Sequence, residues 1–206
     1  MAKCTDMEIP PSPAREQRFL ATVLKSCSGT KLDLSNKELG QNAVAEIART
    51  LKADEHFVSL SIAGNVAKDD GAGFLSEMIG VNTTLTELDL RSNDVGARGA
   101  CDLFRALETN QAVTFVDLSG MSGINRNHIG VRGAQAVATM LQKNHVIWKL
   151  CLQENGLGVE GVEAMAVGLA ANLGLGFLDL ASNALGLAGM QVLSQALPET
   201  RLTTLV

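Results

Sequence analysis

Aromatic residues and histidines are scarce in this chain of 206 residues, which has six phenylalanines, one tryptophan and no tyrosine. The three histidines, His56, His128 and His145, show no metal-ligand spacing with another histidine, a cysteine or a carboxylate. The sequence also contains no Walker loop, no Ser-His-Asp motif and no paired acid and base. These absences favour a non-enzymatic protein that carries no metal and no cofactor.

Secretion and membrane signals are also lacking. The four cysteines form no CxxC pair, and residues 1–17 contain no apolar run of the signal-peptide type. The longest apolar stretch, residues 164–178, is interrupted by Asn172 and is too short to span a membrane. The net charge of -5 argues against a general affinity for nucleic acid or anionic membrane. We therefore expect a soluble cytoplasmic protein with reduced thiols and a protein partner.

In place of these signals, the chain has a repeated pattern of leucine, asparagine and glycine. Six apolar-x-apolar blocks, separated by steps of 28, 28, 28, 34 and 28 residues, begin at Leu32, Leu60, Leu88, Val116, Leu150 and Leu178. A glycine column keeps this register at Gly71, Gly99, Gly133, Gly161 and Gly189. A fixed period of this length predicts a stack of similar structural units.

Each unit is predicted to contain a strand, a turn, a helix and a second turn. The alternating apolar block predicts a half-buried strand, and residues 97–108 show apolar residues at helical spacing. Side chains at the turn after the strand are expected to bond to loop backbone groups: Asn65, Asn93, Asn127, Asn155 and Asn183. Because one unit cannot bury its apolar face alone, neighbouring units must share one core.

The consensus LxxLxLxxN with a 28-residue period resembles the ribonuclease-inhibitor type of leucine-rich repeat, from Leu32 to the end of the chain. The resemblance implies an α/β fold of the solenoid type. This fold is a right-handed α/β horseshoe with a parallel sheet on the concave face and helices on the convex face.

A second resemblance lies in residues 58–93, which are similar to the C-terminal repeat domain of tropomodulins. It is carried by Leu60-Ser61-Ile62, Ser76-Glu77-Met78 and Val81-Asn82-Thr83-Thr84-Leu85. Because tropomodulins cap the pointed end of actin filaments, the resemblance implies a regulator of the actin cytoskeleton. The chain differs from that family in its short segment before the repeats. It also continues its repeats where tropomodulins have a terminal helix.

The domain boundaries follow from the repeat. Residues 1–14 are predicted to be a flexible leader, and residues 15–206 the repeat domain, with a capping helix at 15–28. Repeats begin near residues 29, 57, 85, 113, 147 and 175. Residues 202–206 are predicted to form a partial strand, one residue early in register. Its exposed edge leaves self-association open as an alternative.

The concave face is the predicted partner-binding surface. Its central column has aspartate at four of six positions, and we expect Arg91 and Lys149 to offset the repulsion between Asp89 and Asp117. Exposed aromatic residues in a curved surface are typical of binding hot spots. The alternatives are a solvated polar face and phenylalanines that pack on each other. The predicted contacts are Glu87, Asp89, Arg91, Phe115, Asp117, Arg126, Trp148, Lys149, Cys151, Phe177 and Asp179.

Six extra residues, 121–126, lengthen one step of the repeat from 28 to 34 residues within the stretch LSGMSGINRNHIG. An intact repeat turn separates its glycines from the next helix, so a phosphate site is not favoured. We expect a rim loop beside Phe115, Asp117 and Cys151 that helps the concave sheet to bind a protein partner. The alternatives to this scaffold function are a tropomodulin-like regulator and a Ran-type GTPase activator in which Arg126 stabilises phosphoryl-transfer charge.

We predict that deletion of residues 121–126 leaves the fold intact, because the deletion restores the regular 28-residue step. Circular dichroism and a melting curve check this prediction. Loss of the folded signal would show that the loop is structural.

Overall fold

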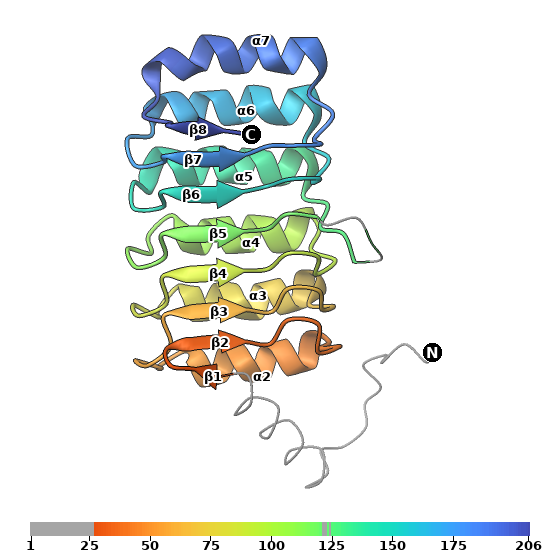
Figure 1. Cartoon of the computed structure of the whole chain (residues 1–206), viewed down its shortest axis with the longest axis vertical. Coiled ribbons are helices and arrows are strands. Elements are labelled where there is room, and N and C mark those ends of the chain that lie inside the picture. Colours follow the sequence, from red (N-terminus) through yellow and green to blue (C-terminus); the bar gives the residue numbers. More distant parts are fainter. Residues whose placement is uncertain (1–26, 121–122, 124) are drawn as a thin grey trace, which may run out of the picture.

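Each leucine-containing block forms one short strand in the computed structural model, which describes residues 27–120, 123 and 125–206. The strands stack in chain order into one sheet, and β2 to β8 are parallel (Figure 1). They are β1 (Cys27–Ser28), β2 (Lys31–Asp33), β3 (Ser59–Ser61), β4 (Glu87–Asp89), β5 (Phe115–Asp117), β6 (Lys149–Cys151), β7 (Phe177–Asp179) and β8 (Thr204–Leu205).

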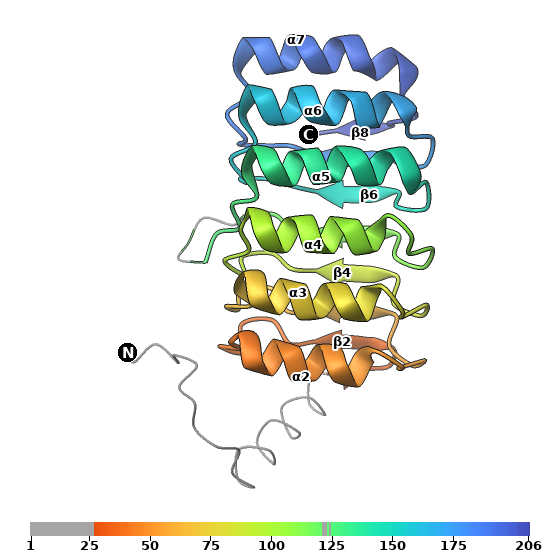
Figure 2. The ribbon, with the colours of Figure 1, turned by 180° about the vertical axis from the view of Figure 1, so that it is seen from behind.

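A layer of helices covers one face of this sheet, as Figure 2 shows from the helix side. Each helix follows its strand and packs against the helices of the neighbouring repeats. They are α2 (Gln41–Leu51), α3 (Lys68–Ile79), α4 (Ala97–Leu107), α5 (Gly130–Lys143), α6 (Gly158–Ala171) and α7 (Gly186–Ala196), with the short 3₁₀ helix η1 (Leu197–Glu199). The predicted α/β leucine-rich-repeat solenoid is therefore confirmed.

The strand pairing keeps the register that the repeat predicts. Val116 pairs with Leu150, so the six extra residues leave the sheet unbroken and emerge as a loop after β5. At the far end, Leu178 pairs with Leu205, one residue early as expected. Val206 is 57% exposed at this edge, and self-association through it stays a prediction.

The N-terminal end differs from the expected cap. Cys27 and Ser28, predicted to end the helix over residues 15–28, form β1, which pairs antiparallel with β2. The prediction is wrong for these two residues because the chain reverses at Gly29, whose φ of 60° suits a tight turn. The leader at 1–14 and the rest of the predicted helix, 15–26, lie outside the described residues.

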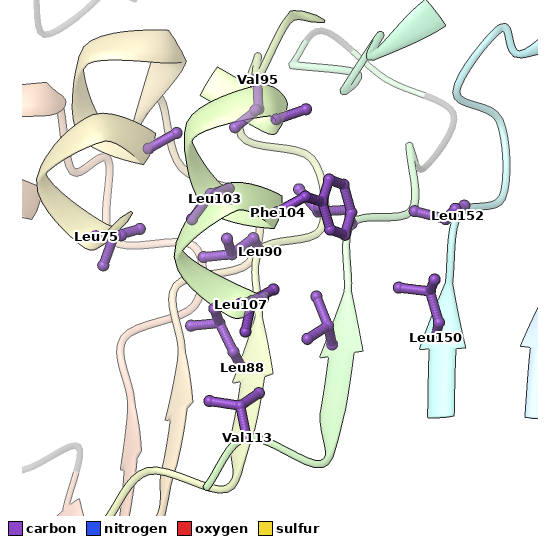
Figure 3. Packing of buried hydrophobic residues seen from close by; sticks show 14 of the residues in the cluster. Leu75, Leu88, Leu90, Val95, Leu103, Phe104, Leu107, Val113, Leu150 and Leu152 are labelled. Carbon is purple, nitrogen blue, oxygen red and sulfur yellow. The ribbon is translucent and has the colours of Figure 1, made fainter. Parts of the chain in front are cut away.

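The core lies between the sheet and the helices (Figure 3). Leu88 and Leu90 of one repeat are fully buried in the same cluster as Leu103, Phe104 and Leu107 of α4. Glycine lets the helices approach: a Cβ on Gly99 would lie 2.8 Å from the Cβ of Ala72. Between α5 and α6 the approach is equally close, since a Cβ on Gly168 would lie 2.8 Å from the Cα of Ala138. The glycine positions therefore set the spacing of the helix layer.

Buried asparagines connect consecutive repeats at the turn that follows each strand. Asn127 accepts hydrogen bonds from the backbone N–H groups of Asn93 (2.9 Å) and Val95 (3.0 Å). It donates to the carbonyls of Leu90 and Leu118, both at 2.9 Å. These backbone groups belong to turns that no strand or helix satisfies, so the side chain takes the place of a backbone partner.

Asn155 completes only half of this pattern. It is fully buried and donates to the carbonyls of Leu118 (2.9 Å) and Gln153 (3.1 Å). Its Oδ1 atom has no hydrogen-bond partner within the described part of the chain. The donors expected from the regular pattern would come from the repeat that carries the extra residues, so the insertion interrupts the asparagine connection at this junction.

We predict that Asn127→Ala lowers the free energy of unfolding by about 3 kcal/mol, because two buried N–H groups and two carbonyls lose their partner. Asn155→Ala should cost about 1–2 kcal/mol less, because its Oδ1 satisfies no donor. Urea unfolding followed by circular dichroism measures both values. Equal losses would contradict the bonding described for Asn155.

Candidate protein-binding surface

The face of the sheet without helices, called here the open face, carries two rows of side chains. The start row lies at the beginning of the strands and comprises Lys31, Ser59, Glu87, Phe115, Lys149, Phe177 and Thr204. The end row lies at the end of the strands and comprises Asp33, Ser61, Asp89, Asp117, Cys151 and Asp179. The residues between the two rows, such as Leu88, point into the core.

In the start row, a lysine is held between two phenyl rings. The Nζ atom of Lys149 lies 4.6 Å from the ring centroid of Phe115 and 4.9 Å from that of Phe177. The three residues are neighbours on β5, β6 and β7, and the arrangement is a double cation–π contact. The phenylalanines therefore pack on the lysine between them and not on each other.

In the end row, Arg91 joins two neighbouring aspartates. Its Nε and Nη2 atoms donate to the carboxylate of Asp89 at 2.9 and 2.7 Å, and Nε lies 3.6 Å from Oδ2 of Asp117. Ser61 donates a further hydrogen bond to Asp89 at 3.0 Å. Arg91 thus offsets the repulsion expected in the aspartate column, whereas the ammonium group of Lys149 lies between the rings.

Burial raises the pKa of two groups in the end row. Desolvation raises the pKa of Asp117, although the backbone N–H of Ser119 donates to the carboxylate at 2.9 Å and lowers it in part. Burial, and then the charge of Asp117, raise the pKa of the Cys151 thiol to about 12. Cys151 is therefore a neutral thiol near pH 7, which does not suit a nucleophile or a metal ligand.

The predicted contact residues differ in exposure. Trp148 is 52% exposed just before β6, and the phenyl rings of Phe115 and Phe177 are half-buried. Asp117 and Cys151 are only 9% and 6% exposed. The accessible part of the predicted surface is therefore the start row with Trp148, whereas Asp117 and Cys151 of the end row expose little contact area.

The rim loop after β5 lies at the edge of the sheet where the strands end (Figure 1). Asp117 and Cys151 are at this edge, but Phe115 is at the opposite end of its strand, contrary to expectation. Of the predicted loop, residues 121, 122 and 124 lie outside the described residues. The aromatic residues therefore lie at the start of the strands, whereas the loop lies at their end.

The described end of the loop is bonded to repeats on both sides. Asn125 donates to the carbonyl of Asn65 at 3.0 Å, and its own carbonyl accepts from the N–H of Asp94 at 2.9 Å. In the other direction, Arg126 lies 3.7 Å from the carboxylate of Glu154 and donates to the Glu154 carbonyl at 3.4 Å. The loop thus spans several repeats.

Sequence reasoning did not single out Ser61 or Glu154 in this region, and it included Asn125 only as part of the rim loop 121–126. A hydroxyl in the aspartate column was a usable signal for Ser61. No comparable signal exists for Asn125 and Glu154, because their contacts depend on the path of an inserted loop that the repeat does not encode.

Two other kinds of site were tested against the described residues. The described residues include no group of three His, Cys, Asp or Glu side chains that could hold a metal ion. None of the helices in the described ranges is long and apolar enough to cross a membrane.

We predict that Arg91→Met lowers the free energy of unfolding by about 1–2 kcal/mol at pH 7, because two adjacent carboxylates lose their shared cation. The loss should shrink at pH 4.5. Because the pKa of Asp117 is raised in the folded state, the folded protein binds a proton there before the unfolded chain does as the pH falls.

Chemical unfolding at the two pH values measures this difference. Arg49→Met, which removes an exposed pair with Glu46 on α2, is the control and should change stability by less than about 0.5 kcal/mol. The same loss for Arg91→Met at both pH values would contradict the role given to Asp117.

Comparison with known proteins gives a consistent match. The model of the TMOD/LMOD leucine-rich domain matches residues 28–155. Human leiomodin-3 is 25% identical over 122 residues, which are 58% of this chain and 21% of leiomodin-3. Mouse leiomodin-1 is 29% identical over 125 residues, 59% of this chain and 20% of that protein. The chain thus spans about a fifth of the length of these relatives.

Two solved structures share the fold. One is described as leiomodin-1 actin-binding site 2, with a TM-score of 0.55 and 21% identity over 68% of this chain and 79% of that chain. The other is the C-terminal domain of tropomodulin from Caenorhabditis elegans, with a TM-score of 0.56 and 14% identity over 76% of this chain and 91% of that chain.

Proposed function

Because the chain belongs to the family of the TMOD/LMOD leucine-rich domain, we propose that it is a non-enzymatic actin-binding domain that acts in the cytoskeleton. Support comes from the leiomodin-1 domain of similar fold, which is described as an actin-binding site. The tropomodulin-like alternative is therefore preferred to a scaffold with an unspecified partner, and a cytoplasmic location belongs to the same proposal.

The proposed contact surface is the start row of the open face, centred on Phe115 and Phe177. Half-exposed aromatic rings contribute large apolar contact areas, which dominate the energy of many interfaces. The ammonium group of Lys149 lies 4.6 and 4.9 Å from the two ring centroids, so both rings face one cation and not each other. Phe115 and Phe177 stand in the same row on either side of Lys149, so one partner surface can contact both rings.

The end row supplies the charge that would orient the partner. Asp33 and Asp179 accept hydrogen bonds from backbone N–H groups at 2.9 Å, but no cation among the described residues forms an ion pair with either. An excess of carboxylates on a binding face attracts basic surfaces and steers their approach. The proposed partner surface therefore combines apolar groups with basic side chains.

The GTPase-activator alternative is less well supported by the rim geometry. A catalytic arginine finger must be free to reach the transferred phosphoryl group. Arg126 is instead bonded to Glu154 through its carboxylate and its backbone carbonyl. Arg126 would have to break these contacts to act as an arginine finger. Protein binding on the open face requires no such change.

Co-sedimentation with actin filaments and elongation from pointed ends test the proposal. We expect Phe115→Ala combined with Phe177→Ala to raise the apparent Kd at least about tenfold, because the central aromatic contacts are lost. Phe74→Ala is the matched control, since Phe74 is 40% exposed on α3 in the helix layer.

The outcomes separate the two parts of the proposal. Failure of the unaltered chain to bind actin would refute actin as the partner. Equal affinity of the unaltered chain and the double variant would refute the start row as the contact surface, even if actin binds.

A further inference from the structure

The space between Phe115 and Phe177, called here the slot, holds the ammonium group of Lys149. Strands β5 and β7 are two steps apart in the sheet, roughly 9.6 Å. The Nζ atom of Lys149 lies 4.6 and 4.9 Å from the two ring centroids, so the ammonium group is midway between the rings. The ammonium group of Lys149 in the slot indicates that the two rings favour a cation.

We propose that this slot is a cation-recognition site in which Lys149 is a built-in competitor, displaced when an arginine side chain of the protein partner enters between Phe115 and Phe177. A guanidinium group suits the slot better than an ammonium group, because it is planar, stacks on aromatic rings and is more weakly hydrated. The arginine therefore gains more from the two rings than the lysine that it replaces.

The surroundings of the slot favour this exchange. Asp117 and Asp179 stand beside Cys151 on the neighbouring strands, in the end row and two residues further along the strands than Phe115 and Phe177. Of these two carboxylates, Asp179 forms no ion pair within the described ranges, so it can receive the displaced ammonium group. On the outer side of Phe115, Glu87 is already paired with Lys31 at 3.5 Å. The exchange thus gives the displaced ammonium group a carboxylate partner, and the two rings hold the entering guanidinium group.

The same surroundings exclude other occupants. An anionic side chain would meet the aspartates of the end row, and a neutral polar side chain would gain no cation–π attraction. This inference rests on the proposed function for the position of the partner. Its test uses a peptide probe in place of actin, so that either proposal can fail alone.

The experiment measures the binding of a capped tetra-arginine peptide by calorimetry at low salt, with the neutral tetra-citrulline peptide for comparison. Lys149→Ala empties the slot and should tighten tetra-arginine binding by about threefold to tenfold, in line with one or two cation–π contacts. Lys31→Ala is the control for charge, because it removes the same charge from the same row and frees the carboxylate of Glu87, but opens no slot.

A third variant separates the rings from the charge. Adding Phe177→Ala to Lys149→Ala removes one wall of the slot and should abolish the gain. Equal tightening by Lys149→Ala and Lys31→Ala would overturn the proposal, because general charge would then explain the effect. Equal binding of the arginine and citrulline peptides to Lys149→Ala would also overturn it.

A measurement on the unaltered chain keeps the proposal testable if a variant does not fold. The side-chain protons of Lys149 between two rings should show upfield ring-current shifts in the proton NMR spectrum. Saturation with tetra-arginine should return these signals toward the values of an exposed lysine. Signals that stay in place at saturation would overturn the displacement of Lys149.

Discussion

Hydrogen bonds from buried asparagines are the constraint on which the other features depend. A strand of three residues is too short to hold its place in a sheet through its own ladder. Asn127 ties the turn of one repeat to the turn of the previous one, and the leucines of both then share one core. With the strands kept in this register, equivalent side chains of successive repeats stand in rows. These rows place residues from several repeats side by side on the open face.

Much of this organisation follows from the sequence. The leucine spacing predicts the strands and their partners, including the pairing of Val116 with Leu150 across the 34-residue step. The N-terminal hairpin was missed because the antiparallel pairing of β1 depends on a turn at Gly29, outside the repeat pattern. A period predicts which units stack, but it says nothing about how the first unit is covered.

The candidate surface was predicted less completely than the fold. Alternation along a strand places Phe115, Lys149 and Phe177 on one face, but not the rotamer that puts the ammonium group between the rings. It also does not predict the burial of Cys151, which depends on the larger side chains around it. The positions of these residues were therefore accessible from sequence, whereas their interactions required the structure.

The Oδ1 atom of Asn155 has no hydrogen-bond partner within the described residues. The junction between the repeats of β5 and β6 therefore has fewer side-chain hydrogen bonds at its loop rim than at the other asparagine turns. At the same junction the helices α5 and α6 are in close contact at Gly168, and the rings of Phe115 and Phe177 clasp Lys149 across three strands. The two blocks of repeats are thus joined at the helix layer and at the start of the strands, while at the loop rim Asn155 keeps only its donated hydrogen bonds. The inserted residues therefore cost this junction one set of side-chain hydrogen bonds, and the contacts of Arg126 with Glu154 offset part of that loss.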